Sequence, residues 1–351
     1  MEKNDKIVCT NIWKVFGPNE KTLLTNLDKN LSRSEVQEKT GHVVAVKDVS
    51  FSVQKGETFV VMGLSGSGKS TLVRCLSRLI EPTSGEVKID NQDVTKMSNK
   101  DLTDLRRNRM SMVFQHFGLF PHRRVIENIG YGLEIRGVKK KDRLDKSMET
   151  LNLVGLEGWD QHYPRELSGG MQQRVGLARA LATNPQILLM DEAFSALDPL
   201  IRSDMQNQLI ELQSQLKKTI VFITHDLDES LRLGDHIGIL NGGRLVQAGT
   251  PEQIIMNPAD DYVEAFVKDV NRAKVLRAKT VMVKANEFNT NNIKLSEVYK
   301  VDESSYIEQF LPKVLSDRCT VMVVDKMGDT KGYITEKELA ISLSKDGHNL
   351  K

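Results

Sequence analysis

The residues with the clearest chemical potential are Gly63 to Thr71, in the order Gly-Leu-Ser-Gly-Ser-Gly-Lys-Ser-Thr. They fit the pattern G-x-x-x-x-G-K-[ST], in which glycines allow successive backbone N–H groups to point at phosphate oxygens. Lys69 would reach the β- and γ-phosphates of a nucleotide, and the Ser70 hydroxyl would contact Mg²⁺. The residues predicted to bind the nucleotide here are Gly63, Ser65, Gly66, Ser67, Gly68, Lys69, Ser70 and Thr71.

The flanking residues supply the context that this loop needs. Residues 58–62 form an apolar, β-rich segment, and residues 72–80 carry apolar side chains at a helical spacing. A strand, a glycine turn and a helix would place the positive end of the helix dipole at the phosphates. An ordinary strand-to-helix turn is the alternative reading of the glycines, and the Gly-Lys-Ser ending argues against it.

A second motif is Leu188-Leu189-Met190-Asp191-Glu192, an apolar run that ends in two acids. At the carboxyl edge of a parallel sheet, Asp191 would hold Mg²⁺ through its water shell, and Glu192 would orient or deprotonate the attacking water. Alone, the pair could be a cap for the next helix. Together with the phosphate loop it predicts nucleotide hydrolysis.

A third motif is Leu167-Ser168-Gly169-Gly170-Met171-Gln172-Gln173-Arg174. Ser168 can cap a helix through residues 175–181, and the two glycines leave backbone N–H groups open to a phosphate. A plain capped helix start is the alternative. One domain cannot readily fold both loops onto the same phosphates, whereas two head-to-tail copies can, so the motif predicts a dimer with composite sites.

Length, composition and charge limit the classes of protein to which the chain can belong. The chain has 351 residues, enough for two or three domains, and 39% hydrophobic with 27% charged residues describes an ordinary globular protein. A net charge of +2 gives no nucleic-acid signature. The three scattered cysteines, Cys9, Cys75 and Cys319, indicate a reducing compartment. No apolar leader or 18-residue apolar run occurs, so other chains would form any membrane channel.

Strands alternate with helices along most of the chain, which predicts a mostly parallel α/β sheet. The helical segments expected are an inserted excursion at 18–42, a subdomain at about 116–168 and an amphipathic helix at 199–216. The strands expected are 7–16, 43–53, 58–62, 86–90, 110–114, 187–190, 219–223, 236–240 and 244–247.

The composition changes near residue 271, where Arg272, Lys274, Arg277 and Lys279 occur without an acid. We expect a linker or an exposed helix end there. The remainder predicts a small β-α-β-β-α unit near the lower size limit for an independent core. Its expected elements are strand 280–283, helix 304–315, strands 320–324 and 331–334, and helix 335–344.

The motifs at 63–71, 167–174 and 188–192, with Gln115, Ser195 to Asp198, and His225, follow the order of the ATP-binding cassette (ABC) ATPases. Over residues 7–270 the chain resembles that family. The resemblance implies a P-loop NTPase fold, ATP and Mg²⁺ as cofactors, and ATP hydrolysis.

The resemblance extends to the ATPase subunits of glycine betaine/proline importers, through Phe16-Gly17 with the insertion after it, residues 78–83, Pro121-His122 and residues 191–200. It implies a homodimer peripheral to the cytoplasmic face of the inner membrane, with a separate permease, an extracytoplasmic binding protein and no nucleic acid. Glycine betaine, proline betaine, choline, carnitine and trimethylamine N-oxide all stay open as cargo.

Family roles are carried over at matching positions. Phe16 would stack on adenine, Gln115 would contact Mg²⁺ and the water, Asp198 would cross the dimer interface, and His225 would contact the γ-phosphate. Ser168, Gly169, Gly170 and Gln173 would cover the nucleotide bound by the other subunit.

The C-terminal unit resembles a cystathionine-β-synthase-type (CBS) module at 320–325 and 332–335, with one clear copy and a remnant at 276–295. We therefore predict an ABC domain at 1–273 and a CBS-like module at 274–351. The module would be regulatory, responding to ionic strength, or would only aid dimer stability.

Two other function classes compete with the importer subunit. A soluble ABC ATPase of DNA repair or translation usually has two cassettes, a long coiled coil or a basic surface, and this chain has none of these. A P-loop kinase would lack the motif at 167–174.

Overall fold

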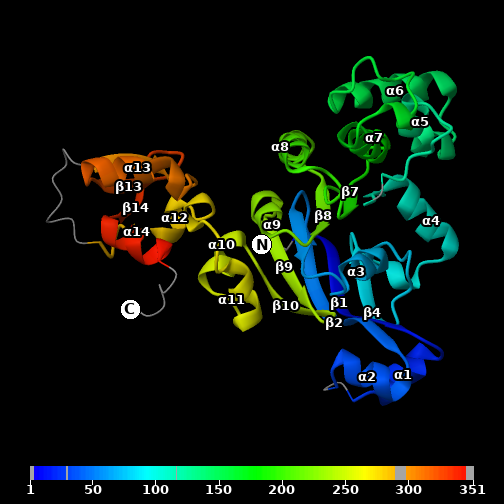
Figure 1. The fold of residues 1–351 in the computed structure, drawn as a ribbon, viewed down its shortest axis with the longest axis horizontal. Helices are drawn as coiled ribbons and strands as arrows, with labels where there is room; N and C mark the ends of the chain where they lie inside the picture. The colour runs from blue at the N-terminus through cyan, green and yellow to red at the C-terminus, as the bar shows by residue number, and fades with distance from the viewer. Residues whose placement is uncertain (1–3, 29–30, 116, 289–297, 345–351) are drawn as a thin grey trace. The chain divides into compact units, whose positions relative to one another are not determined.

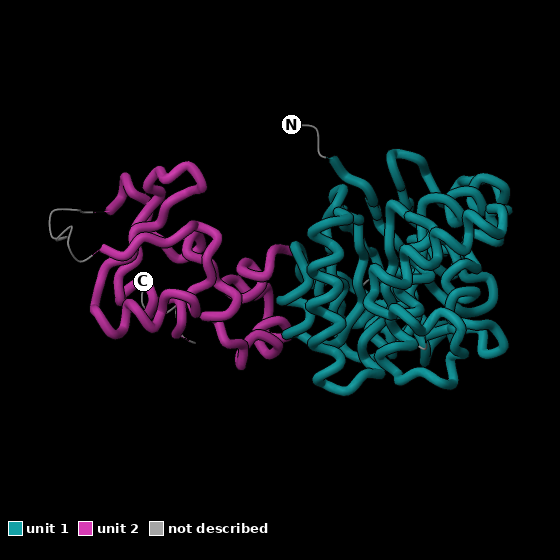
Figure 2. The backbone as a smooth tube through the Cα atoms, turned by 90° about the horizontal axis from the view of Figure 1, so that it is seen from above, with its two compact units in different colours: residues 1–248 teal, residues 249–351 magenta. Residues whose placement is uncertain are grey.

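The computed structural model describes residues 4–28, 31–115, 117–288 and 298–344. The chain divides into two compact units, residues 1–248 and 249–351 (Figure 2). This division falls before the last residue of β10 (Arg244–Gly249), ahead of the composition change near residue 271 on which the predicted domain boundary at 273/274 was based.

The larger unit contains a six-stranded sheet in the order β10-β9-β3-β8-β7-β6 (Figure 1). Strand β3 lies between β8 and β9, and both pairings are parallel, as are β7–β8 and β6–β7. The alternation of strands and helices had predicted this mostly parallel sheet. The strands are β3 (Thr58–Met62), β6 (Met110–Val113), β7 (Ile187–Asp191), β8 (Thr219–Thr224), β9 (His236–Asn241) and β10 (Arg244–Gly249).

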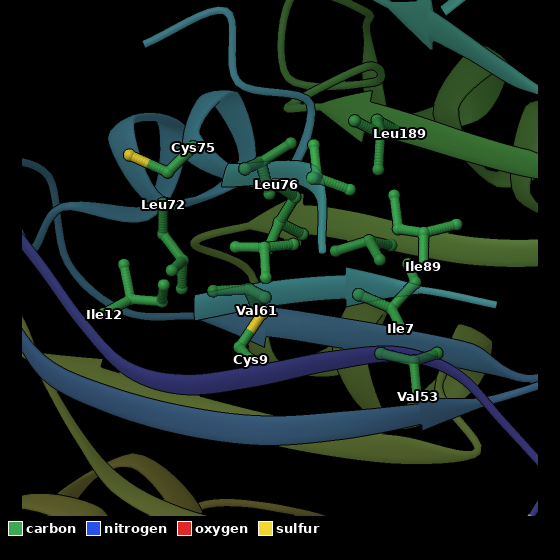
Figure 3. Packing of buried hydrophobic residues seen from close by; sticks show 14 of the residues in the cluster. Ile7, Cys9, Ile12, Val53, Val61, Leu72, Cys75, Leu76, Ile89 and Leu189 are labelled. Carbon is green, nitrogen blue, oxygen red and sulfur yellow. The ribbon is translucent and has the colours of Figure 1, made fainter. Parts of the chain in front are cut away.

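A second, four-stranded sheet has the order β2-β1-β4-β5, and its pairings are antiparallel. The sequence had not separated these strands from the parallel sheet. They are β1 (Asp5–Phe16), β2 (Val43–Gln54), β4 (Ser84–Ile89) and β5 (Gln92–Asp93). Side chains from both sheets and from α3 (Lys69–Leu76) form one buried core, in which Ile7, Cys9, Val61 and Leu72 pack together (Figure 3). This core fixes the phosphate loop between the two sheets.

Most helices of the larger unit match the predicted segments. Helix α8 (Pro199–Leu216) has the predicted bounds, with Asp198 as its N-cap and a proline at its first position. Helix α3 ends at Leu76, earlier than the predicted residue 80. The others are α4 (Asn99–Asn108), which was not predicted, α5 (Val125–Ile135), α6 (Lys140–Leu153), α7 (Gly169–Ala182) and α9 (Leu227–Leu233).

The predicted insertion after Phe16 is helical. It holds α1 (Glu20–Asn26) and α2 (Arg33–Thr40), and α2 begins at a Ser32–Glu35 capping box. Val36 is buried with Trp13, Val15 and Val44, and the leucines at 23, 24, 27 and 31 pack against this group. The insertion therefore has a small apolar cluster of its own.

The smaller unit contains a four-stranded sheet in the order β11-β14-β13-β12. Its strands are β11 (Val283–Lys284), β12 (Val298–Asp302), β13 (Thr320–Val324) and β14 (Thr330–Ile334). Its helices are α10 (Pro251–Met256), α11 (Asp261–Val267), α12 (Ala278–Val281), α13 (Ile307–Asp317) and α14 (Glu336–Leu343). From β12 onward the order is β-α-β-β-α, which is the predicted order, although its first strand was predicted at 280–283 and is β12 instead.

Two local predictions for this unit are wrong. Residues 278–281 are helical rather than the start of a strand, because Ala278 and Val281, three residues apart, both face the core. Strand β12 was missed, and the predicted helix at 304 begins at Ile307. Part of the predicted remnant at 276–295 lies outside the described residues.

The basic stretch at 271–279 is not a solvated linker. Ala273, Leu276 and Ala278 are buried in the core of the smaller unit. Arg272 donates hydrogen bonds to the Ser344 and Ser342 carbonyls, at 2.7 and 3.4 Å. Arg277 lies over the Tyr306 ring, 5.3 Å from its centroid. Only Lys274 and Lys279 of the four cations are exposed.

Candidate functional site

The phosphate loop connects the end of β3 to the start of α3, as the sequence predicted. Two glycines are required by close backbone contacts. A Cβ atom on Gly63 would lie 2.3 Å from the Leu240 carbonyl oxygen, and one on Gly68 would lie 2.2 Å from that of Ala45. Both also have positive φ, +154° and +102°. The turn that aims the N–H groups of the loop thus depends on residues without side chains.

Lys69 lies across the inside of this loop and is 4% exposed. Its Nζ donates to the carbonyl oxygens of Gly63 at 2.8 Å and Leu64 at 3.0 Å. Burial lowers the pKa of Lys69, and the nearby Glu192 carboxylate, 3.7 Å from Nζ, opposes this shift. A buried ammonium bonded to two carbonyl oxygens is well placed to exchange these contacts for phosphate oxygens.

Asp191 ends β7 beside the start of α3. The Ser70 hydroxyl donates to its carboxylate at 2.7 Å, and the Arg74 guanidinium lies 3.4 Å away. Asp191 is 4% exposed, so its charge is held by neighbours rather than by solvent. The structure therefore brings together Ser70 and Asp191, two of the three residues predicted to contact Mg²⁺, which are far apart in the sequence.

Glu192 has a backbone φ of +46°, which is uncommon for a residue with a side chain. Its N–H donates to the Ile223 carbonyl at 3.1 Å, and the Ser195 hydroxyl donates to its carbonyl at 2.9 Å. These bonds aim its carboxylate at two predicted catalytic residues. Gln115 Nε2 lies 3.3 Å from one carboxylate oxygen, and His225 Nδ1 lies 3.7 Å from the same oxygen.

The loop after Gln115 is held by α7. The Arg179 guanidinium donates to the carbonyl oxygens of Phe117 and Gly118, at 3.0 and 2.5 Å. Burial lowers the pKa of Arg179. Helix α7 therefore connects the third motif at its start to the loop that carries Gln115.

Among the described residues, the third motif at 167–174 makes no contact with Lys69. Ser168 caps α7 by accepting from the Met171 N–H at 3.4 Å, and both Ser168 and Gly169 are exposed. Gln173 is fully buried, and neither atom of its amide has a partner among the described residues. Asp198 caps α8 by accepting from the Ile201 N–H at 3.1 Å.

Phe16 ends β1, is 41% exposed, and has the Lys14 ammonium 5.0 Å from its ring centroid. The side chain predicted to stack on adenine is thus partly exposed, with the Lys14 ammonium over its ring.

Comparison with known proteins identifies this arrangement. Residues 46–195 match the ABC transporter family. The glycine betaine/carnitine transport ATP-binding protein GbuA of Listeria monocytogenes is 56% identical over 279 residues, covering 80% of this chain and 70% of its own. The trimethylamine N-oxide transport system ATP-binding protein TmoW of Pelagibacter ubique is 48% identical, covering 93% of this chain and 94% of its own. The chain belongs to the ATP-binding subunits of ABC transporters.

A solved ABC cassette supports the same assignment. It is a dimer in a post-hydrolysis state bound to ADP and Pi, is 31% identical, and superposes with a TM-score of 0.59 over 70% of this chain and 98% of its own. This chain is accordingly an ATPase. Within the described residues of this ABC subunit, every helix is too short or too polar to cross a bilayer.

Three residues of the site were missed from the sequence. Arg74 lies one helical turn after Ser70, so an i,i+4 reading of α3 could have found it. Ser195 lies three residues after Glu192 and binds its carbonyl, a spacing typical of a turn. Arg33, whose guanidinium donates to the Gly66 carbonyl at 2.9 Å, carries no sequence signal because it lies in the insertion.

Proposed function

We propose that this ATPase powers an importer for glycine betaine or a related quaternary amine or osmolyte, through a separate permease. The observation that carries the proposal is the cluster of Lys69, Ser70, Asp191 and Glu192. It occurs in a chain that is similar to proteins named for glycine betaine, carnitine and trimethylamine N-oxide transport. A DNA-repair or translation ATPase, the competing class, has no comparable support in these relatives.

The site fits a bound Mg²⁺. Ser70 and Asp191 supply hard oxygen atoms at one place, and Mg²⁺ completes its shell with waters and phosphate oxygens rather than with a cage of side chains. Bound Mg²⁺ would neutralise phosphate charge.

Side chains and backbone N–H groups of the chain have the remaining roles in ATP binding and hydrolysis. Lys69 and the loop N–H groups bind the β- and γ-phosphates and stabilise the charge that develops during transfer. Glu192 accepts the proton of the attacking water, and Gln115 and His225 orient that water and the γ-phosphate. Phe16 stacks on the adenine ring. These roles rest on the family resemblance together with the contacts of Glu192.

We propose that the exposed Ser168 and Gly169 cover the nucleotide of a second copy, giving a homodimer with two composite sites. The dimeric solved cassette supports this arrangement. Because Gln173 is fully buried, the motif offers a surface to the second copy only at the start of α7. Asp198 would lie at the same interface.

We propose that a cavity of about 330 Å³ is the docking surface for the permease. It lies between α5 and the parallel sheet, and its exposed apolar residues include Leu79, Phe114 and Ile135. Phe114 immediately precedes Gln115, which contacts Glu192. An apolar permease segment seated here would act on the catalytic carboxylate through one residue. We therefore place the subunit at the cytoplasmic membrane face, with an extracytoplasmic binding protein completing the importer.

The function is tested by co-expressing the chain with its permease and measuring co-purification and ATP-driven uptake of glycine betaine, proline betaine, choline, carnitine and trimethylamine N-oxide. Ile135→Asp is expected to weaken permease binding ~10²-fold or more, because docking would bury an unpaired carboxylate. Met148→Asp adds the same charge to an exposed apolar position on α6 and should leave binding unchanged. Uptake of none of the five solutes would reject the proposed cargo class.

We propose that the smaller unit regulates transport. The motifs that carry catalysis all lie before residue 230, and the unit resembles a CBS module. With one clear module per chain, pairing would come from the second subunit. Of its entrance cations only Lys274 and Lys279 are exposed, and these would respond to ionic strength or to an anionic lipid surface.

Lys274→Gln with Lys279→Gln is expected to weaken binding to anionic vesicles by ~10-fold or more, since each lysine contributes about 1 kcal/mol near such a surface. The salt dependence of transport should flatten while ATP hydrolysis persists. Lys326→Gln with Lys337→Gln removes two exposed charges from the same unit as a control. An unchanged salt response would leave dimer stabilisation as the role of the unit.

A further inference from the structure

One side chain, His42, joins the two ends of the insertion that follows Phe16. Its Nε2 lies 2.7 Å from the carbonyl oxygen of Pro18, where the chain enters the insertion. Its Nδ1 lies 2.8 Å from the carbonyl oxygen of Thr40, the last residue of α2. His42 is 8% exposed, so these carbonyl groups, rather than water, are the main partners of its ring.

The two contacts define the protonation of the ring. Carbonyl oxygens only accept hydrogen bonds, and a neutral imidazole has a proton on only one of its nitrogens. The other nitrogen would then turn its lone pair towards a carbonyl oxygen at hydrogen-bond distance. The Thr40 hydroxyl lies 3.2 Å from Nδ1, but it already donates to the Val36 carbonyl at 2.6 Å. Two protonated ring nitrogens satisfy both carbonyls, so the geometry fits an imidazolium.

The surroundings of the ring have opposing effects on its charge. Burial disfavours a charged ring. The C-terminal end of α2 favours it, because the negative end of the helix dipole and a carbonyl without an intrahelical partner lie there. The charged side chains on the adjoining parts of β1, α1, α2 and β2 are Lys14, Glu20, Lys21, Glu38, Lys39 and Lys47. Lys14 and Glu20 pair with each other at 2.9 Å, and Lys21, Glu38 and Lys39 are exposed. The two carbonyls and the helix end therefore compensate the charge of the ring.

His42 also borders Phe16, the residue proposed to stack on adenine. Gly17, directly after Phe16, has a φ of +146°, and a Cβ atom on it would lie 2.3 Å from His42 Cδ2. Val43, directly after His42, pairs with Phe16 at the end of the β1–β2 ladder. The ring thus packs against the backbone that follows Phe16, and its own backbone leads into the strand partner of Phe16. A displacement of the ring would shift the residues on both sides of the aromatic side chain.

We propose that His42, as an imidazolium bonded to Pro18 and Thr40, positions Phe16 for the adenine ring of the nucleotide. The proposal rests on the adenine contact proposed above for Phe16. Loss of the ring proton removes one of the two hydrogen bonds and loosens the end of the insertion beside Phe16. Histidine is the side chain that ordinarily changes charge between pH 5 and 8, so the affinity for adenine nucleotides falls as the pH rises.

The protonation of the ring is tested by ¹⁵N NMR of the full chain labelled at histidine, with His42→Gln identifying the signals of His42 by their loss. Both ring nitrogens should be protonated at pH 6, and one proton should be lost on raising the pH. This measurement needs no nucleotide, so it is independent of the role of Phe16. A ring with a single protonated nitrogen at every pH from 5.5 upward would overturn the proposal.

The positioning role is tested by calorimetry with ADP and with pyrophosphate, which lacks the base, at pH 6 and pH 8.5. The ratio of ADP to pyrophosphate affinity should fall ~5-fold or more at pH 8.5 in the unaltered chain, because stacking of a base contributes about this much. The His42→Gln chain should have the low ratio at both pH values, with unchanged pyrophosphate affinity. His122→Gln, which removes an exposed histidine from the same unit, should keep the response of the unaltered chain.

Thermal unfolding of each variant at both pH values checks its fold. An ADP to pyrophosphate ratio with the same pH response in the His42→Gln chain would overturn the positioning role. An equal loss of ADP and pyrophosphate binding would also overturn it, because His42 would then support the phosphate loop. Unchanged ADP affinity of a Phe16→Ala chain would reject the adenine contact of Phe16 and with it this coupling, which distinguishes that failure from a neutral ring in the NMR spectrum.

Discussion

Replacing Glu192 by Gln is expected to lower ATP hydrolysis by ~10²-fold or more while ATP still binds. Glutamine keeps the shape of the side chain but cannot accept the proton of the attacking water. The carboxylate is largely buried and lies 3.7 Å from Lys69 Nζ and 3.3 Å from Gln115 Nε2, so no solvent base readily replaces it. Phosphate release and nucleotide binding by the purified assembly measure the two effects.

The matched control is Glu211→Gln, which makes the same change at an exposed position of α8. It should hydrolyse ATP normally. Near-normal turnover by the Glu192→Gln protein would remove Glu192 from the role of general base. Loss of ATP binding would instead indicate that the carboxylate supports the fold of the loop through its charge beside Lys69.

Mixing Lys69→Ala subunits with Ser168→Arg subunits is expected to recover hydrolysis that neither variant shows alone. In a head-to-tail dimer each site combines Lys69 of one copy with Ser168 of the other. Each homodimer then has two defective sites. A mixed dimer has one doubly altered site and one intact site, so random pairing would return roughly a quarter of the original activity if sites act independently.

Ser168→Arg also removes the cap of α7, in which Ser168 accepts from the Met171 N–H. Loss of such a cap costs about 1 kcal/mol, so thermal unfolding of this variant is compared with that of the unaltered chain. Full activity of strictly monomeric protein would contradict the composite site. So would activity of the Ser168→Arg homodimer equal to that of the unaltered protein.

The sequence by itself determined the features that depend on neighbouring residues. Gly63 to Thr71 needs only a strand before it and a helix after it, and both are visible as local patterns. Helix α8 has its predicted bounds because Asp198 and Pro199 define its start. The apolar run ending in Asp191 and Glu192 predicted a buried strand with its acids at the sheet edge, and the structure confirmed that strand.

The family resemblance also predicted roles for residues that no local sequence pattern connects to the motifs. His225 and Gln115 belong to segments far apart in the chain, and no spacing rule brings them to Glu192. The structure places both within 3.7 Å of one carboxylate oxygen. Arg33 had neither a motif nor a family match, so its bond to Gly66 was found only in the structure.

Tertiary structure alone decided how strands are shared between sheets and where the compact units divide. Strand β1 pairs with β2 and β4 instead of joining the parallel sheet, because pairing depends on partners far along the chain and on which face is buried.

In the smaller unit, Ala278 and Val281 form a helical turn because both reach one core, although the surrounding residues alternate like a strand. The local sequence likewise predicted that the basic residues near 272 are exposed to solvent. Arg272 instead donates to a distant carbonyl group, and Arg277 lies over a distant aromatic ring. Local patterns fix what a segment can form, and the energy of burial against distant segments selects among those forms.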